Sequence, residues 1–249
     1  MVVLKTVGEI QTMQHACKLS AQALELAGKA IKPGVTTWDV DALIHDFIVG
    51  AGAKPSFLHY GGYPASSCIS INDEIIHGIP NRHRVIHEGD IVSVDVGAYI
   101  DGYHGDNAYT YVAGEVSDEA KKLLEATEQS LREAIKVAVA GNRLGDIGFA
   151  VQSYVEARGF SVIREYVGHG VGRDLHEDPE VPNYGKAGHG MRLVPGMTIA
   201  IEPMVAAGKS AVKRLSDQWT VVTADHSLAA HFENTILITQ GEPVILTKA

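Results

Sequence analysis

The sequence predicts an α+β fold in which two related helix-plus-hairpin units surround an antiparallel sheet. Three observations support this prediction: long segments with helical spacing of apolar residues, short segments rich in β-branched residues, and an internal repeat with an offset of 107 residues. No linker rich in Pro, Gly or Ser separates the two units. We therefore expect residues 1–249 to form a single domain.

Helices and strands are expected in a definite order along the chain. Apolar residues recur every three or four positions from Thr6 to Ile31, and Lys32-Pro33-Gly34 ends this helix. Thr36-Thr37 is suited to cap a second helix. The expected helices are residues 6–31, 38–51, 117–140 and a fourth that starts near Asp146 and stops at Gly159; the expected strands include 67–71 and 91–96.

The internal repeat aligns acidic residues that lie within apolar strands. Gly34-x4-Asp39-Val40 corresponds to Gly141-x4-Asp146-Ile147, and at the same offset residues 89–95 correspond to residues 196–202. Asp95 therefore corresponds to Glu202, and Asp106-Asn107 resembles Glu233-Asn234, with about 20 more residues between the two acids of the second unit. A two-fold arrangement would bring both acidic pairs to one central place.

The four acids, Asp95, Asp106, Glu202 and Glu233, point to a cation. If Asp101-Gly102 is a two-residue hairpin turn, Asp95 lies opposite position 108 and on the same sheet face as Asp106, whereas a bulge at Gly105 would bring the two acids closer or break this parity. Ionised carboxylates in apolar strands are costly unless they are paired or bind a metal. Salt bridges are the alternative, but the nearby sequence offers few Lys or Arg partners. One or two divalent cations explain the pattern better, and a metal pair can activate a water molecule for hydrolysis.

Three of the twelve histidines stand out by their surroundings. His169 is flanked by glycines, His176 follows seven residues later, and His77 lies just after the strand at 67–71. Spacing alone does not separate a metal ligand from a proton donor among these three. His104 and His231 stand two residues before Asp106 and Glu233, so a supporting role beside the ligands is a further hypothesis.

Composition excludes several other classes of protein. The net charge of −9 disfavours a nucleic-acid or anionic-membrane binder, and no apolar run reaches the roughly 20 residues of a membrane span. The two cysteines cannot build a disulfide framework. The N-terminus lacks a signal-peptide core. We expect a cytoplasmic protein without a direct nucleic-acid-binding motif.

Together these stretches resemble the type I methionine aminopeptidases. The resemblance covers almost the whole chain from Thr6 and is carried by CISINDEIIHGIP (68–80), VDVGAYIDGYHGD (94–106), GHGVGRDLHEDPEVPNYG (168–185), GMTIAIEPM (196–204) and SDQWTVVTADHSLAAHFENTI (216–236). It implies the "pita-bread" fold, whose internal pseudo-two-fold agrees with the repeat. It also implies a single catalytic domain that removes the initiator methionine from nascent polypeptides and peptides when the second residue is small.

The resemblance assigns roles to the candidate residues. Two divalent ions (Co, Mn, Fe or Zn) would be held by Asp95, Asp106, His169, Glu202 and Glu233. Asp95 would bind through both oxygens, and Asp106 and Glu233 would bridge the two ions. Glu202 would also move protons from the bridging water to the leaving amine. His77 and His176 would contact the substrate and stabilise the tetrahedral intermediate. The substrates would be the N-termini of nascent polypeptides at the ribosome, and the protein would act as a monomer.

The methionine pocket implied by the resemblance involves Tyr60, Tyr63, Cys68 and Trp219, although aromatic residues also fill ordinary cores. Two departures affect this region. Asp174-Leu175 stands where close relatives usually have Gly-Phe, so the pocket lacks that aromatic wall. Phe57 stands where a cysteine is common at the rim.

Two other functions deserve comparison. Proline-specific aminopeptidases and dipeptidases share the five ligands, but they usually carry a large N-terminal domain, which we do not expect here. A non-catalytic relative that binds a ribosome or nucleic acid would have lost ligands, and all five positions are intact.

Overall fold

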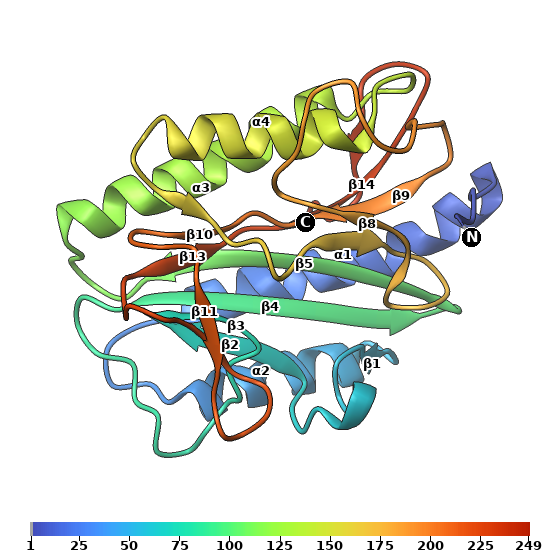
Figure 1. The fold of residues 1–249 in the computed structure, drawn as a ribbon. Coiled ribbons are helices and arrows are strands. Elements are labelled where there is room, and N and C mark those ends of the chain that lie inside the picture. The colour runs from blue at the N-terminus through green and yellow to red at the C-terminus, as the bar shows by residue number, and fades with distance from the viewer. Residues whose placement is uncertain (1) are drawn as a thin grey trace.

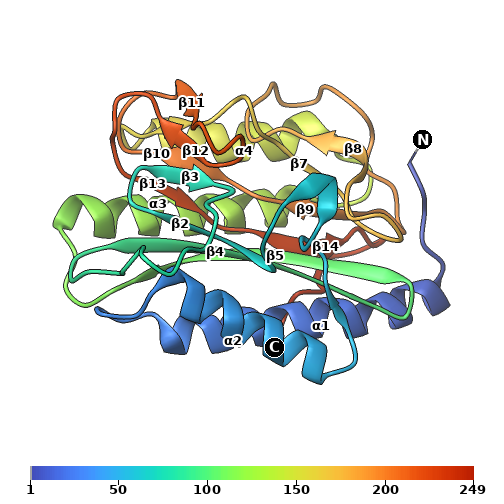
Figure 2. The same cartoon turned by 90° about the horizontal axis from the view of Figure 1, so that it is seen from below.

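Four helices enclose the antiparallel strands of the protein, for which a computed structural model describes residues 2–249. The helices are α1 (Val7–Ala30), α2 (Thr37–Gly50), α3 (Asp118–Val137) and α4 (Leu144–Glu156). In Figure 1, α1 and α2 cover one side of the strands and α3 and α4 cover the other. Figure 2 shows the same layers from below. Among residues 2–249, none of the helices combines the length and apolarity needed to cross a membrane.

The strands pair antiparallel in four sheets. β4 (Ile91–Ile100) is as long as β5 (Tyr103–Val112), at ten residues each, and pairs with β5, β2 and β1. A five-stranded sheet has the order β15-β14-β9-β7-β8, and two three-stranded sheets have the orders β13-β10-β6 and β11-β12-β3. The remaining bounds are β1 Lys54–Pro55, η1 Tyr60–Gly62, β2 Ser67–Ile71, β3 Glu74–Ile76, β6 Ser161–Val162, β7 Gly168–Gly170, β8 Glu177–Val181, β9 Thr198–Ile201, β10 Met204–Ala206, β11 Val212–Arg214, β12 Val221–Thr223, β13 Ala229–His231, β14 Asn234–Leu237 and β15 Val244–Ile245.

The predicted repeat is visible in this order of elements. Both α4 and β9 begin 107 residues after their counterparts α2 and β4. The hairpin β4–β5 corresponds to the pair β9–β14, and the two meet where the Glu233 backbone N–H donates to the Ala108 carbonyl at 2.9 Å. Three element ends differ from expectation by three residues or more: β4 continues to Ile100, because the hairpin is longer, α3 ends at Val137 and α4 ends at Glu156.

Small residues let α1 lie directly on β5. A capping box of Thr6 and Glu9 starts this helix, and its buried face carries mainly Ala, Ser and Cys. A side chain at Gly105 would place its Cβ 2.4 Å from the backbone of Cys17, so only glycine fits there. This close approach fixes the part of β5 that carries the neighbouring Asp106.

Candidate metal centre and adjoining pocket

Asp95 and Asp106 lie on the two strands of the long hairpin, as predicted. Asp95 is opposite Ala108, and Asp106 is opposite Gly97. The turn at Asp101-Gly102 has φ values of 55° and 84°, which is the backbone of a type I′ turn. The two-residue turn therefore sets the register that places both carboxylates on the same face of the sheet.

The second unit contributes Glu202, Glu233 and His169 to the same place. Glu202 directly follows β9, Glu233 directly precedes β14, and His169 is the central residue of β7. The His169 Nε2 atom lies 3.6 Å from Glu202 Oε1 and 3.8 Å from Asp106 Oδ2. Candidate ligand atoms of Asp106, His169 and Glu233 all lie within 4.8 Å of one another.

Burial strongly perturbs these five side chains. Burial raises the pKa of Asp95, Glu202 and Glu233 well above their ordinary values, and repulsion from neighbouring carboxylates adds to the rise. The pKa of Asp106 rises to about 7, again through burial. Burial lowers the pKa of His169 to about 3. The site thus favours a neutral imidazole beside acids that need a positive partner.

The donor set fits divalent metal ions. Asp95 Oδ1, Asp106 Oδ1 and Glu233 Oε1 are buried and have no hydrogen-bond partner among the described atoms. Within residues 2–249, no Lys or Arg forms an ion pair with the four carboxylates. Carboxylate oxygens with one imidazole nitrogen suit Mn, Fe, Co or Zn. Unpartnered buried oxygens are costly, and bound cations would satisfy them.

His77 and His176 both line the cavity that the carboxylates line. The ring of His176 is 4.2 Å from that of His169, and a 2.9 Å hydrogen bond joins its Nδ1 to the Tyr60 hydroxyl. His77 packs edge-on against Trp219. Burial, with the nearby His176, lowers the pKa of His77 to about 4, so it is neutral at pH 7.

Of the two histidines that precede ligand candidates, only His231 lies beside an acid of the candidate centre. Its buried Nε2 is 3.6 Å from Glu202 Oε2. His104 instead points its Nδ1 at the Ser56 hydroxyl, 2.8 Å away. Being two residues before a ligand on a strand is therefore not sufficient for contact with the carboxylates.

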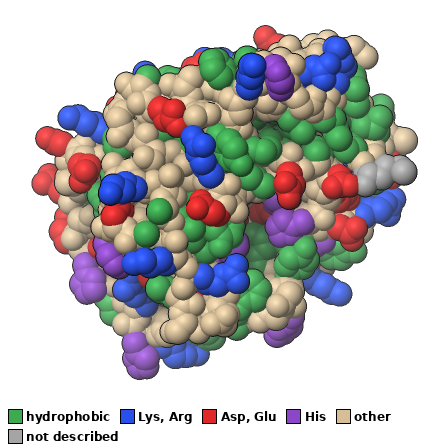
Figure 3. Space-filling view, in the orientation of Figure 1, with side chains coloured by type: hydrophobic (Ala, Val, Ile, Leu, Met, Phe, Trp, Pro, Cys, Tyr) green, Lys and Arg blue, Asp and Glu red, His purple; other side chains and the backbone are tan. Residues whose placement is uncertain are grey.

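A cavity of about 210 Å³ adjoins the acids, and the predicted pocket residues line it. Tyr63 and Cys68 are almost fully buried, while Tyr60 is 46% exposed. The lining comprises Phe57, Tyr60, Tyr63, Cys68, His77, Leu175, His176 and Trp219 together with the five acid and imidazole candidates. Both departures from the family pattern, Phe57 and Leu175, thus belong to the cavity wall. On the face in Figure 3, hydrophobic, acidic and histidine side chains gather around a hollow near the middle.

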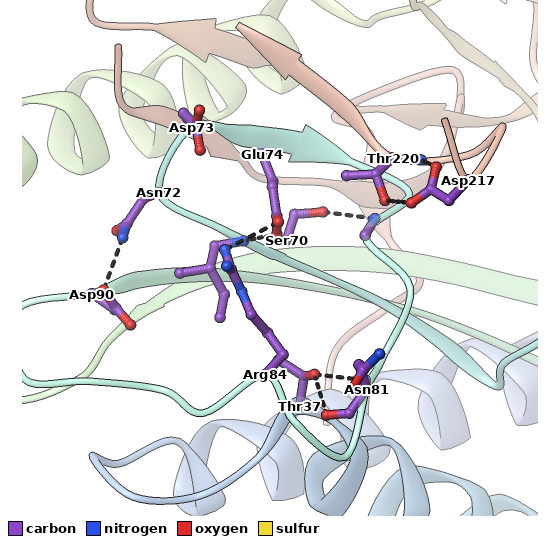
Figure 4. A network of polar contacts seen from close by, with 12 residues as sticks. Thr37, Ser70, Asn72, Asp73, Glu74, Asn81, Arg84, Asp90, Asp217 and Thr220 are labelled. Atoms are coloured by element: carbon purple, nitrogen blue, oxygen red, sulfur yellow. Dashed lines mark hydrogen bonds and ion pairs between the residues drawn. The ribbon is translucent and has the colours of Figure 1, made fainter. Parts of the chain in front are cut away.

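A polar network links residues on both sides of His77 in the chain, including Ser70, Glu74 and Arg84 (Figure 4). Glu74 accepts hydrogen bonds from the Ile71 backbone at 2.7 Å and from Arg84 at 3.1 Å. The Ser70 hydroxyl accepts from the Gly78 backbone N–H at 3.1 Å. These contacts hold His77 in a left-handed conformation with φ 58°, which non-glycine residues seldom adopt.

Two features of the site were not predicted from the sequence. Asn183 is fully buried and donates from Nδ2 to the Glu202 carbonyl at 2.8 Å, so it fixes the backbone of a ligand candidate. Asp217 caps the turn before Trp219 through bonds to the backbones of Trp219 and Thr220. An Asp two residues before Trp219 is a turn signal that the sequence does contain.

A larger hollow of about 660 Å³ lies between α3 and α4. It is lined by Glu133, Asp146, Phe149, Arg158 and neighbouring residues, and none of the five metal-ligand candidates reaches it. The chemistry of the smaller cavity therefore makes it the better candidate site.

Comparison with known proteins agrees with this geometry. Residues 11–240 match metallopeptidase family M24. The chain is 55% identical to the methionine aminopeptidase of Clostridium acetobutylicum, with 99% of each chain covered. This chain belongs to the methionine aminopeptidases of metallopeptidase family M24. The crystal structure of methionine aminopeptidase from Thermotoga maritima superposes with a TM-score of 0.99 at 50% identity, covering 100% of both chains.

A protein of another specificity shares the fold. The prolidase from Pyrococcus horikoshii OT3 superposes with a TM-score of 0.80 at 26% identity, and the match covers 100% of this chain but 64% of that one. The pita-bread fold and the metallopeptidase class are therefore confirmed. Similarity of fold alone does not separate methionine release from cleavage before proline, whereas identity with the methionine aminopeptidases does.

Proposed function

We propose that the chain removes the N-terminal methionine of nascent polypeptides and peptides when the second residue is small, using two divalent cations. One observation carries the proposal: five candidate ligands from both halves of the fold converge, with unpartnered buried oxygens, at the wall of a largely apolar cavity of about 210 Å³. We further propose that residues 1–249 form one catalytic domain that acts as a cytoplasmic monomer on N-termini leaving the ribosome.

Asp95, Asp106, His169, Glu202 and Glu233 would hold the cations. When bound, the cations activate a water molecule as the nucleophile and polarise the scissile carbonyl. Co, Mn, Fe and Zn all fit the donor set, and availability would decide among them.

Glu202 is suited to move the proton. Its carboxylate is buried between two imidazoles, with Oε1 3.6 Å from His169 and Oε2 3.6 Å from His231. A carboxylate held in this position can accept a proton from the attacking water and donate it to the leaving amine.

His77 and His176 would bind the reacting carbonyl oxygen. Both line the cavity, and the neutral imidazole of His77 can donate one hydrogen bond without adding charge to the site. Donors arranged in advance around a developing oxyanion are worth roughly 2.7–4 kcal/mol each in comparable sites. The Tyr60 hydroxyl restricts the His176 ring to one orientation.

The apolar wall explains the choice of methionine. Tyr63, Cys68 and Leu175 are at most 5% exposed, and together with Phe57 they form one hydrophobic cluster. An unbranched thioether packs well against such aromatic and sulfur-containing walls. The closed end of the cavity would leave only the first residue of a peptide within reach of the acids.

Peptide hydrolysis tests the proposal. Protein loaded with Mn, Co or Fe is incubated with Met-Ala-Ser, Met-Pro and Ala-Pro peptides, and the released amino acids are measured. Methionine release from Met-Ala-Ser is expected. Cleavage of Ala-Pro in preference would instead assign the prolidase specificity. No turnover with any of these metals would refute the proposed peptidase activity.

The role of Glu202 is tested by Glu202→Ala, with the exposed Glu180→Gln as the matched control. We expect the first variant to lose turnover by at least about 100-fold, as for a general acid–base, and the second to keep it. Substantial activity in Glu202→Ala would show that another group moves the proton.

A further inference from the structure

A buried ion pair lies under the loop that carries His176. Lys5 and Glu177 are 172 residues apart in sequence, yet the Lys5 ammonium donates directly to Glu177 Oε2. The two side chains are only 3% and 9% exposed. The Lys5 ammonium also donates to the Val3 carbonyl at 3.2 Å. The segment before α1 therefore reaches the residue that directly follows a candidate catalytic histidine.

The Glu177 carboxylate fills the inside of the loop at residues 172–177. Its Oε1 accepts a hydrogen bond from the Asp174 backbone N–H at 3.3 Å. A side chain at Gly172 would place its Cβ 2.3 Å from the same oxygen and 2.6 Å from Lys5 Cε. The loop backbone thus closes directly over the ion pair.

The same loop supplies two residues to the cavity. Leu175 is 2% exposed in the pocket wall, and His176 faces the acids beside His169. A shift of Glu177 would move both side chains, because they directly precede it in the chain.

Lys5 is itself held at a fixed position. Its backbone N–H donates to the Gly196 carbonyl at 2.8 Å. Gly196 has φ 89°, and a Cβ there would lie only 3.0 Å from the Lys5 carbonyl oxygen. On the other side, the Thr6–Glu9 capping box begins α1. The backbone of Lys5 is therefore anchored to the β8–β9 connection and to the start of α1.

Stability alone does not account for this pair. Removing two charges from water is expensive, and replacing a whole buried ion pair by apolar residues is often neutral or stabilising. What the pair adds is a specific geometry: it joins one charged atom of the N-terminal segment to one carboxylate of the loop.

We propose that Lys5 is a positioning residue that acts through Glu177 to hold His176 and Leu175 in place. The inference rests on the proposed function for its kinetic consequences. Its structural part, the placement of the His176 ring, does not depend on activity.

The experiment compares four variants. Lys5→Met leaves a lone buried carboxylate, whereas Lys5→Met/Glu177→Met leaves no buried charge. Lys5→Arg keeps the charge, and Arg173→Met is the matched control. Arg173 belongs to the same loop as His176 and also forms an ion pair with α1, through Glu9, but this pair lies on the exposed side of the loop.

Three quantities are measured: kcat and KM for Met-Ala-Ser with metal content checked, the free energy of unfolding, and the His176 imidazole signals in an NMR spectrum assigned with His176→Gln. In Lys5→Met, kcat falls by about tenfold to 100-fold, metal content is unchanged and the His176 signals shift. Lys5→Arg recovers part of kcat. In the double variant stability returns, while kcat stays low and the His176 signals stay shifted. Arg173→Met behaves like the unmodified protein in all three.

Two results would overturn the proposal. One is a Lys5→Met variant whose kcat and His176 signals match those of Arg173→Met. The other is a double variant that recovers kcat together with stability, since the pair would then only support folding. If Lys5→Met does not fold, kcat and the His176 signals of the double variant still test the proposal. If the unmodified protein releases no methionine, the proposed function fails, and the NMR comparison still tests the positioning.

Discussion

The metal-free protein should lose stability as the pH rises from 4 to 7, and Asp106 is the residue with which to measure this. Burial raises the pKa of Asp106 from the ordinary 3.8 to about 7. Between these values the folded state binds a proton that the unfolded state releases. The stabilisation is therefore complete below about pH 4 and is lost as the pH rises toward 7.

The magnitude follows from the same two values. One pKa unit corresponds to about 1.4 kcal/mol, so the rise from 3.8 to about 7 is worth about 4 kcal/mol. In Asp106→Asn this titration is absent. Asp106 also contributes to the raised pKa of Asp95, Glu202 and Glu233, so its removal relieves them in the same direction. The unmodified protein should thus lose about 4 kcal/mol or more relative to Asp106→Asn between pH 4 and 7.

Urea denaturation in the presence of a chelator measures the two free energies of unfolding at each pH. Asp46→Asn, at an exposed aspartate of α2, is the matched control, and its change in the free energy of unfolding with pH is compared with that of Asp106→Asn. Adding Mn at about 100 times its dissociation constant should restore about 2.7 kcal/mol at pH 7. A difference between Asp106→Asn and the unmodified protein that stays constant from pH 4 to 7 would refute the reasoning.

Two further predictions concern packing. Gly105→Ala forces a Cβ to within 2.4 Å of the Cys17 backbone, which cannot give way as a side chain can. We expect a loss of at least about 1–3 kcal/mol, measurable as a lower Tm, while Gly50→Ala, which meets no atom within 4 Å, serves as the control. Leu175→Phe adds volume where Phe57 already occupies the wall, so KM for Met-Ala-Ser should rise and recover in Leu175→Phe/Phe57→Cys; an equal KM in all three proteins would show that the two positions do not share space.

The fold was largely predictable because local signals agree with tertiary structure. Thr36 caps α2 as predicted, α1 lies within one residue of its predicted bounds 6–31, and the strand at 67–71 has the predicted bounds. The Asp101-Gly102 turn fixed the register of β4 and β5, which in turn placed the first two acids. The division of the strands into four sheets was not predictable, since hydrophobic patterning says which residues are buried but not which edges pair.

The site was predictable only in part. Four acids in apolar strands demanded a positive partner, and they do converge. His169 was selected over His77 and His176 by resemblance alone, because glycine neighbours and spacing do not report which imidazole faces a carboxylate. Asn183 was missed because its contact is with the backbone of Glu202, and such contacts leave no residue pattern in a single sequence.

The four acids follow the internal repeat, whereas the pocket that would select the N-terminal residue does not. Asp95 and Asp106 in one unit correspond to Glu202 and Glu233 in the other, so the acids that would hold the cations follow the pseudo-two-fold. The pocket does not. About 20 additional residues separate the acids of the second unit, and this insertion contains β11, β12 and Trp219, which closes the cavity beside His77. Changes in that insertion should therefore alter which N-terminal residue is accepted without disturbing the acids that would hold the cations. Changes in the Asp101-Gly102 turn should disturb those acids without altering which residue is accepted.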